Sequence, residues 1–192
     1  MPGTEPTVSQ SLTLILDEVH QLLNRLQAEQ PTALEQVAAA LSEASTVFVH
    51  GAGRSGVAVR ALAMRLMHLG LTVHVVGETT TPAIAEGDVL LAVSGSGTTV
   101  SVVRSAETAV SVGARVVAVT NEASSPLAQA ASLTLLVGAA SKTDRSGTAS
   151  AQYAGSLFEQ SVLLIGDALF HTVWQRSGQS AEALWPRHAN LE

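Results

Sequence analysis

Two short segments rich in glycine, serine and threonine carry the residue types that bind a phosphate group. Gly51–Gly56 reads GAGRSG and Ser94–Thr99 reads SGSGTT. Each segment follows an apolar run typical of a strand and precedes a stretch with helical periodicity. Backbone N–H groups at a helix start favour an anion, and glycine lets the main chain approach it closely. We therefore expect a phosphate-ester site where two neighbouring strands end.

Small hydroxyls and amides in these segments are the candidate phosphate ligands. Hydroxyls donate hydrogen bonds without adding bulk or charge. One arginine lies among them, and its guanidinium, which stays charged, would stabilise the phosphate or an anionic intermediate. The predicted substrate-binding set is Arg54, Ser55, Ser94, Gly95, Ser96, Gly97 and Thr99.

Other readings of these segments fit less well. In GAGRSG the third glycine comes too early for a dinucleotide fingerprint, and no acidic residue ends the next predicted strand to hold a ribose. Glu78, in the loop that follows that strand, is the one candidate. Neither segment contains the lysine of a P-loop. A plain flexible turn at Ser94–Thr99 stays an alternative, although six small polar residues exceed what a turn needs.

Composition bounds the class of protein. The 192 residues are 46% hydrophobic and 14% charged, which indicates one globular domain with a core. No cysteine is present, so disulfides, thiolate metal sites and a cysteine nucleophile are excluded. A net charge of -6 without a basic cluster argues against nucleic acid as a partner. No apolar run reaches transmembrane length, and we expect a cytoplasmic protein without a membrane partner.

Strand and helix signals alternate along the chain, which predicts an α/β fold with a five-stranded parallel sheet flanked by helices on both faces. An N-terminal helical extension is expected over residues 1–30 and the domain itself over 31–192. The last long helix is expected over about 149–176. The predicted strands are 46–50, 72–76, 88–93, 115–119 and 133–137.

Three segments together resemble the SIS (sugar isomerase) domain family: Gly53–Gly56, Ser94–Thr99 and Gly155–Gln160 (GSLFEQ). The resemblance extends over about residues 34–192 and includes the terminal Arg187–Glu192 (RHANLE). It implies a single SIS domain with a flavodoxin-like sheet, no metal or organic cofactor, and a homotetramer with sites near subunit boundaries. Members usually carry Pro-Met where this chain has Tyr153-Ala154.

The same resemblance implies a small-molecule sugar phosphate as substrate and an isomerisation that moves a carbonyl between C3 and C2 through an enediol. An isomerase of the arabinose 5-phosphate type and a non-catalytic sugar-phosphate-binding module are the alternatives. The first usually carries additional regulatory domains. The second would lack a catalytic glutamate.

One glutamate and one histidine are the predicted catalytic residues. Glu159 follows two apolar residues near the start of a helix, where partial desolvation would make its carboxylate a base. On its residues alone the favoured interpretation of Glu159 is a solvated helical glutamate, and the resemblance reverses that preference in favour of the base. His188, in the C-terminal tail, is the candidate for moving a hydroxyl proton, because histidine titrates near neutral pH. His68 is its rival, and Gln152 is a further possible site residue.

Overall fold

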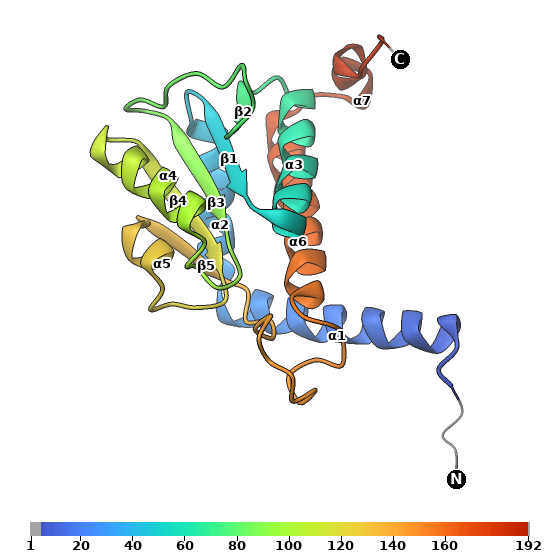
Figure 1. Cartoon of the computed structure of the whole chain (residues 1–192). Coiled ribbons are helices and arrows are strands. Elements are labelled where there is room, and N and C mark those ends of the chain that lie inside the picture. The colour runs from blue at the N-terminus through green and yellow to red at the C-terminus, as the bar shows by residue number, and fades with distance from the viewer. Residues whose placement is uncertain (1–4, 192) are drawn as a thin grey trace.

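Five short strands form one fully parallel sheet in the order β2-β1-β3-β4-β5 (Figure 1). The structure, a computed structural model, describes residues 5–191. The strand order is that of a flavodoxin-like sheet, so the predicted fold class is confirmed. The strands are β1 Val47–Gly51, β2 Val73–Val75, β3 Val89–Val93, β4 Arg115–Thr120 and β5 Leu133–Leu136.

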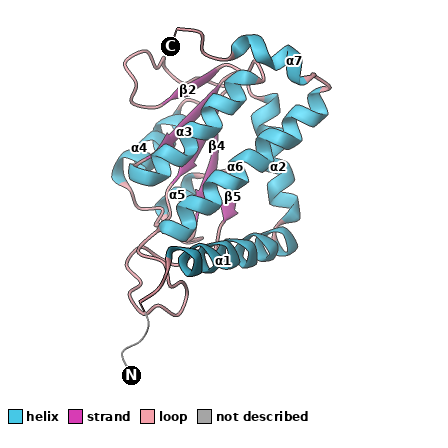
Figure 2. Ribbon diagram, turned by 90° about the vertical axis from the view of Figure 1, so that its right-hand side faces the viewer, coloured by secondary structure: helices cyan, strands magenta, loops and turns pink. Residues whose placement is uncertain are grey.

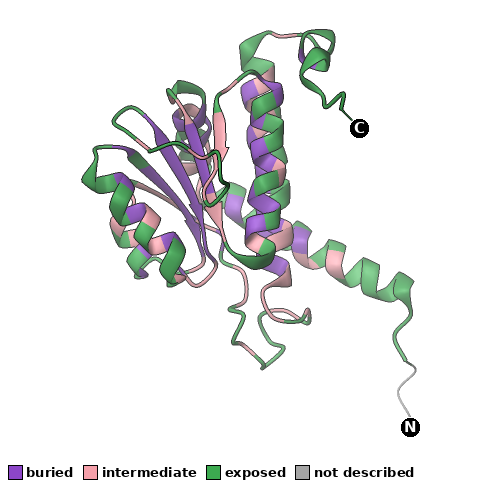
Figure 3. Ribbon diagram, turned by 45° about the horizontal axis from the view of Figure 1, so that its top comes forward, coloured by how far each residue is buried: buried purple, intermediate pink, exposed green. Residues whose placement is uncertain are grey.

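Helices cover both faces of the sheet and divide the core into two parts. One face carries α1 (Val8–Glu29), α2 (Pro31–Glu43), α3 (Gly53–His68) and α6 (Ser156–Ser177), whose apolar residues form the larger cluster. The other face carries α4 (Val100–Ser111) and α5 (Pro126–Ala130). The central strand β3 is buried along its whole length, as Figure 3 shows for the middle of the sheet.

The N-terminal helix α1 extends beyond the body of the molecule in Figure 1, and Figure 2 shows it below α6. Its C-terminal half packs into the larger cluster through Val19, Leu22 and Leu26. Val8 and Leu12, on the N-terminal half, are exposed. Half of α1 therefore belongs to the core of the domain. The predicted boundary at residue 30 stays a prediction.

The long helix α6 begins at Ser156, seven residues later than predicted. Residues 150–152 are held instead by Glu18 of α1, which accepts hydrogen bonds from the Ser150 hydroxyl, the Ala151 N–H and the Gln152 amide. Ala154 then takes a positive φ of 54°, a left-handed conformation that interrupts a right-handed helix. A contact with a residue 132 positions away therefore overrides local helix propensity.

The C-terminal segment forms the short helix α7 (Ala181–Leu184) and a 3₁₀ turn, Trp185–Arg187. Arg187 donates from its guanidinium to the carbonyls of His68 and Ala183, which fixes the tail to the C-terminal end of α3.

Candidate active site

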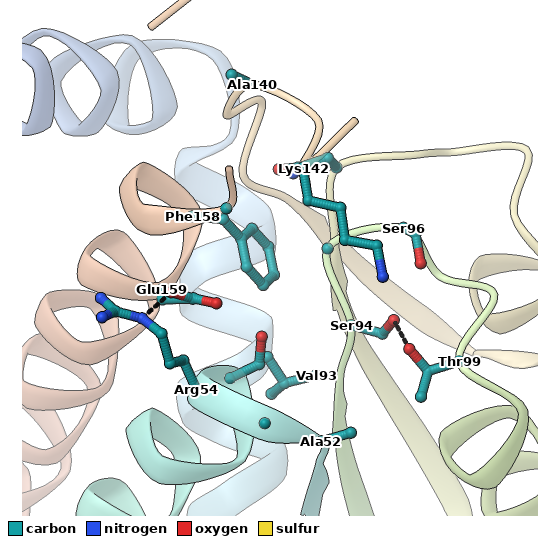
Figure 4. A pocket seen from close by; sticks show the side chains of 15 residues that line it. Ala52, Arg54, Val93, Ser94, Ser96, Thr99, Ala140, Lys142, Phe158 and Glu159 are labelled. Atoms are coloured by element: carbon teal, nitrogen blue, oxygen red, sulfur yellow. Dashed lines mark hydrogen bonds and ion pairs between the residues drawn. The ribbon is translucent and has the colours of Figure 1, made fainter. Parts of the chain in front are cut away.

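A cavity of about 330 Å³ opens at the carboxyl ends of β1 and β3 (Figure 4). These two strands are neighbours in the sheet, and β2, which follows β1 in sequence, lies on the other side of β1. The chain order thus reverses between β1 and β3, which is the position where open α/β sheets bind ligands. Residues 52–55 after β1 and residues 94–96 and 99 after β3 line the cavity.

Three helices begin at this cavity with no side chain capping their first amides. The N-cap residues are Ala52 for α3, Thr99 for α4 and Gly155 for α6, and none accepts a capping hydrogen bond in its side chain. Thr7, Ser125 and Ser180, in contrast, cap helices that begin elsewhere. The unpaired N–H groups and the positive ends of the three helix dipoles therefore face one space, which favours an anion there.

Hydroxyl groups form the wall of the cavity on the β3 side. The side chains of Ser94 and Thr99 share a hydrogen bond of 2.9 Å between their oxygens. Ser96 accepts hydrogen bonds from the N–H and the hydroxyl of Thr98, so its own proton is available to a ligand. The segment is also fixed to β4, because the Asn121 N–H donates to the Gly95 carbonyl.

A carboxylate and a guanidinium form the opposite wall. Arg54 donates from Nε to Oε2 of Glu159, and Figure 4 shows the glutamate directed into the cavity from the first turn of α6. The Glu159 side chain is 18% exposed and that of Arg54 67%. The carboxylate is thus mostly sheltered from water, beside the buried ring of Phe158. Ser55 also lines the cavity.

The turn from β1 into α3 depends on Gly56. A Cβ at Gly56 would lie 2.5 Å from the carbonyl oxygen of Gly51, closer than any real contact. This approach brings the first turn of α3, with Arg54 and Ser55, against the end of β1. Gly56, the last glycine of GAGRSG, therefore serves helix–strand packing as well as access to a ligand.

Two lining residues with polar side chains had no role in the sequence analysis. Asn121 directly follows β4 and accepts a hydrogen bond from the Ala139 N–H at Oδ1. Lys142, the only lysine of the chain, lies in the loop between β5 and α6. Both follow strands at the same edge of the sheet as the two glycine-rich segments, and that position is the signal that could have identified them.

Gly97 and Gln152, both expected at the site, lie outside this cavity. Gly97 has a φ of +62°, and a Cβ there would lie 2.0 Å from the Ser125 hydroxyl oxygen, so it serves a close approach to α5. Gln152 accepts a hydrogen bond from Gln160 and donates one to Glu18, in the neighbouring anchor of the β5–α6 loop.

The two histidines lie at the other end of α3. His68 and His188 stack with their ring centroids 4.1 Å apart, and Trp185 packs on His188 at 4.7 Å. The 16-residue helix α3 is about 24 Å long, and Arg54 is at its opposite end. The fold of one chain therefore does not bring His188 or His68 to its own Glu159.

Burial, together with the neighbouring His188 and Arg65, lowers the pKa of His68. Its Nδ1 is buried and has no hydrogen-bond partner within residues 5–191. The neutral ring is the form that this environment favours.

Across residues 5–191 no three histidine or acidic side chains lie close enough together to hold a metal ion. No helix of that part of the chain is long and apolar enough to span a bilayer.

The comparisons with known proteins show the family to which the chain belongs. The SIS domain model matches residues 40–164, and the chain belongs to the SIS domain family. It is 50% identical to the 3-hexulose-6-phosphate isomerase of Mycobacterium gastri, over 96% of this chain and 92% of that protein. It is 37% identical to the enzyme of the same name from Bacillus subtilis, over 93% and 95% of the two chains.

A solved structure from Methanococcus jannaschii, described as inferring a molecular function of 3-hexulose-6-phosphate isomerase, superposes with a TM-score of 0.82. That protein is 28% identical, with 95% of this chain and 99% of that one covered.

Proposed function

We propose that this chain is a 3-hexulose-6-phosphate isomerase, which interconverts D-arabino-hex-3-ulose 6-phosphate and D-fructose 6-phosphate. The observation that carries the proposal is a sheltered carboxylate, Glu159, across one cavity from a wall of hydroxyls and helix-start amides. The 50% identity to an enzyme of that name over nearly the whole chain supports the choice of substrate.

Phosphate binding positions the sugar in this scheme. The amides at the start of α4 and the hydroxyls of Ser94, Ser96 and Thr99 hold the dianion. The cavity then leads the sugar carbons toward Glu159 and Arg54 on the opposite wall. A bound phosphate thus supplies the orientation that brings C2 near the base.

Glu159 acts as the general base. Its carboxylate removes the proton from C2 of the 3-ketose, the C2–H electrons form the C2–C3 double bond, and the C3 carbonyl becomes the enediolate oxygen. The same proton is returned to C3 and the hydroxyl proton moves from O2 to O3, so the carbonyl is at C2 and C3 carries a hydroxyl. Arg54 orients the carboxylate and stabilises the enediolate. No net oxidation occurs.

The forward reaction begins from an open-chain sugar. The phosphate blocks the C6 hydroxyl, which is the group that would close a five-membered ring on C3. Ring opening is therefore needed in the reverse direction only, where fructose 6-phosphate is the substrate.

The hydroxyl-proton shuttle assigned to His188 then comes from a neighbouring copy. His188 is exposed in the C-terminal tail, at the far end of α3 from its own site. The expected homotetramer, with sites near subunit boundaries, would supply it in trans. The cytoplasm, where sugar phosphates are metabolised, is the proposed location.

A coupled assay tests the function. A source of 3-hexulose 6-phosphate is supplied, and coupling enzymes that consume fructose 6-phosphate report its formation. Turnover of that substrate supports the proposal. No turnover of 3-hexulose 6-phosphate together with turnover of arabinose 5-phosphate would assign the chain to the alternative isomerase class. Binding of sugar phosphates without turnover of either substrate would indicate a non-catalytic module.

A further inference from the structure

Lys142 projects into the cavity from the loop between β5 and α6. Figure 4 shows its ammonium on the side of Ser94 and Ser96, across the cavity from the ion pair of Arg54 and Glu159. It is the one lysine in a chain with a net charge of -6.

The charges of the cavity leave this ammonium without a counter-ion. Arg54 is paired with Glu159, whereas Lys142 forms no ion pair with any of residues 5–191. A phosphate monoester carries close to two negative charges at neutral pH. Three helix starts supply only fractional positive charge, about half a unit each at most. The full positive charge of Lys142, beside the hydroxyl wall, supplies the remaining charge needed to neutralise a phosphate dianion.

The loop is held at both ends near the cavity. Ala139 donates its N–H to Asn121 at 3.0 Å, three residues before Lys142. At the other end, Ser150 donates its hydroxyl to Glu18 at 2.6 Å. Residues 141–143 between these anchors are exposed, so the Lys142 side chain can change its conformation to meet a ligand. The two anchors keep the backbone of the loop beside the cavity.

We propose that Lys142 binds the phosphate group of the substrate and holds the β5–α6 loop over it. This inference rests on the proposed function and names a further residue of the same site. An ammonium on a four-carbon stem is a compact point charge that suits a phosphate. Its position opposite Glu159 assigns it to binding and not to the proton transfers.

The test compares Lys142→Met, Lys142→Arg and the control Arg145→Met, which makes the same charge change at an exposed position of the same loop. Calorimetric titration measures binding of inorganic phosphate and of fructose 6-phosphate to each full chain, after thermal melts have shown equal folding. We expect Lys142→Met to weaken both about 10- to 100-fold, the range of a charge-assisted hydrogen bond. Lys142→Arg should stay within about threefold of the wild type, and Arg145→Met should be unchanged.

Steady-state kinetics separate binding from chemistry. Lys142→Met should raise KM by the same factor and change kcat less than about threefold. Unchanged affinity for inorganic phosphate in Lys142→Met would overturn the inference, and so would a loss in kcat with KM unaltered. A wild type that binds phosphate through Lys142 but has no isomerase activity would refute the proposed function alone.

Discussion

Arg54 and Glu159 form an ion pair that joins the first turn of α3 to the first turn of α6, across 105 residues of sequence. Both helix starts face the cavity, so the pair fixes the carboxylate relative to the phosphate-binding wall. The guanidinium is the more exposed partner, at 67% against 18%. An approaching ligand can therefore meet the arginine from the solvent side while the carboxylate stays sheltered.

Glu159→Gln should abolish turnover and leave binding of sugar phosphates nearly intact. Glutamine keeps the length of the side chain but cannot accept the C2 proton, and loss of a general base commonly costs about 10²–10⁴ in rate. The measurement is kcat in the coupled assay beside the Kd of fructose 6-phosphate. Glu107→Gln, an exposed change on α4, is the control. Turnover within about tenfold of the wild type would remove Glu159 as the base.

Ser96→Ala should weaken phosphate binding far more than it affects folding. The Ser96 hydroxyl accepts hydrogen bonds only from Thr98 within the described chain, so its proton is available to a ligand. We expect the Kd of fructose 6-phosphate to rise about tenfold and the free energy of unfolding to change by less than about 1 kcal/mol. Ser111→Ala, at the far end of α4, should leave the affinity unchanged. An equal Kd in Ser96→Ala and the wild type would contradict the phosphate assignment.

The sheet could be predicted from the sequence because the signals for each strand lie within the strand and its immediate neighbours. Each strand is a short apolar run bounded by glycine or polar residues, and the five predicted strands match the observed ones to within one residue at each end. The GRSG and SGSGTT segments lie at the cavity for the same reason, since parallel strands place their carboxyl ends at one edge.

The residues that sequence reasoning missed or misplaced depend on distant contacts. Nothing near Lys142 in sequence shows that it lines the cavity, since the distant residues Glu18 and Asn121 fix its loop. The start of α6 was predicted too early because the same Glu18 holds residues 150–152. His188 reaches its stack with His68 through the tail that Arg187 fixes, a pairing that no spacing in the sequence reveals.

Mixing two inactive variants tests whether His188 serves a neighbouring site. In one chain His188 stacks on His68 at the C-terminal end of α3, whereas Glu159 of α6 pairs with Arg54 at the N-terminal end of α3. Each variant alone lacks one of the two proposed catalytic groups and should be impaired. Glu159→Gln and His188→Ala chains, unfolded and refolded together, should regain part of the activity, because some sites then combine an intact glutamate with an intact histidine. The control mixes each variant only with itself. Absence of any recovery in verified hybrid oligomers would exclude transfer of His188 between copies.

The stability of the folded chain should fall on mild acidification, in part through His68. Burial, with His188 and Arg65, lowers the pKa of His68 in the folded chain, whereas in the unfolded chain the pKa of His68 has its ordinary value of about 6.5. Between the two values the unfolded state binds more protons, so the free energy of unfolding rises with pH there and declines as pH drops below about 6.5.

Urea unfolding at a series of pH values measures this effect. His68→Gln should flatten the dependence between pH 7 and pH 5 without abolishing it, because burial also lowers the pKa of His50. His20→Gln, an exposed change on α1, should keep the wild-type slope. A slope in His68→Gln as steep as that of the wild type would refute the assignment.

Glu18→Ala should release the β5–α6 loop and expose it to proteolysis. Burial raises the pKa of Glu18, but hydrogen bonds from Ser150, Ala151 and Gln152 outweigh burial and hold the pKa below its ordinary value. The carboxylate therefore stabilises the anchor above the pKa of the unfolded state and loses this effect only as pH falls through the folded value. At pH 8 the anchor is fully formed in the wild type.

Trypsin cleaves after Lys142 and Arg145, so the cleavage rate of the folded protein reports opening of this loop. We expect Glu18→Ala to raise the rate at pH 8 about tenfold or more, since charge-assisted hydrogen bonds are lost. Asp17→Ala, an exposed neighbouring change on α1, should leave the rate unaltered. Fructose 6-phosphate should slow cleavage of both chains if the loop closes over the phosphate. Equal rates in Glu18→Ala and Asp17→Ala would mean that the α1 contact does not hold the loop in place.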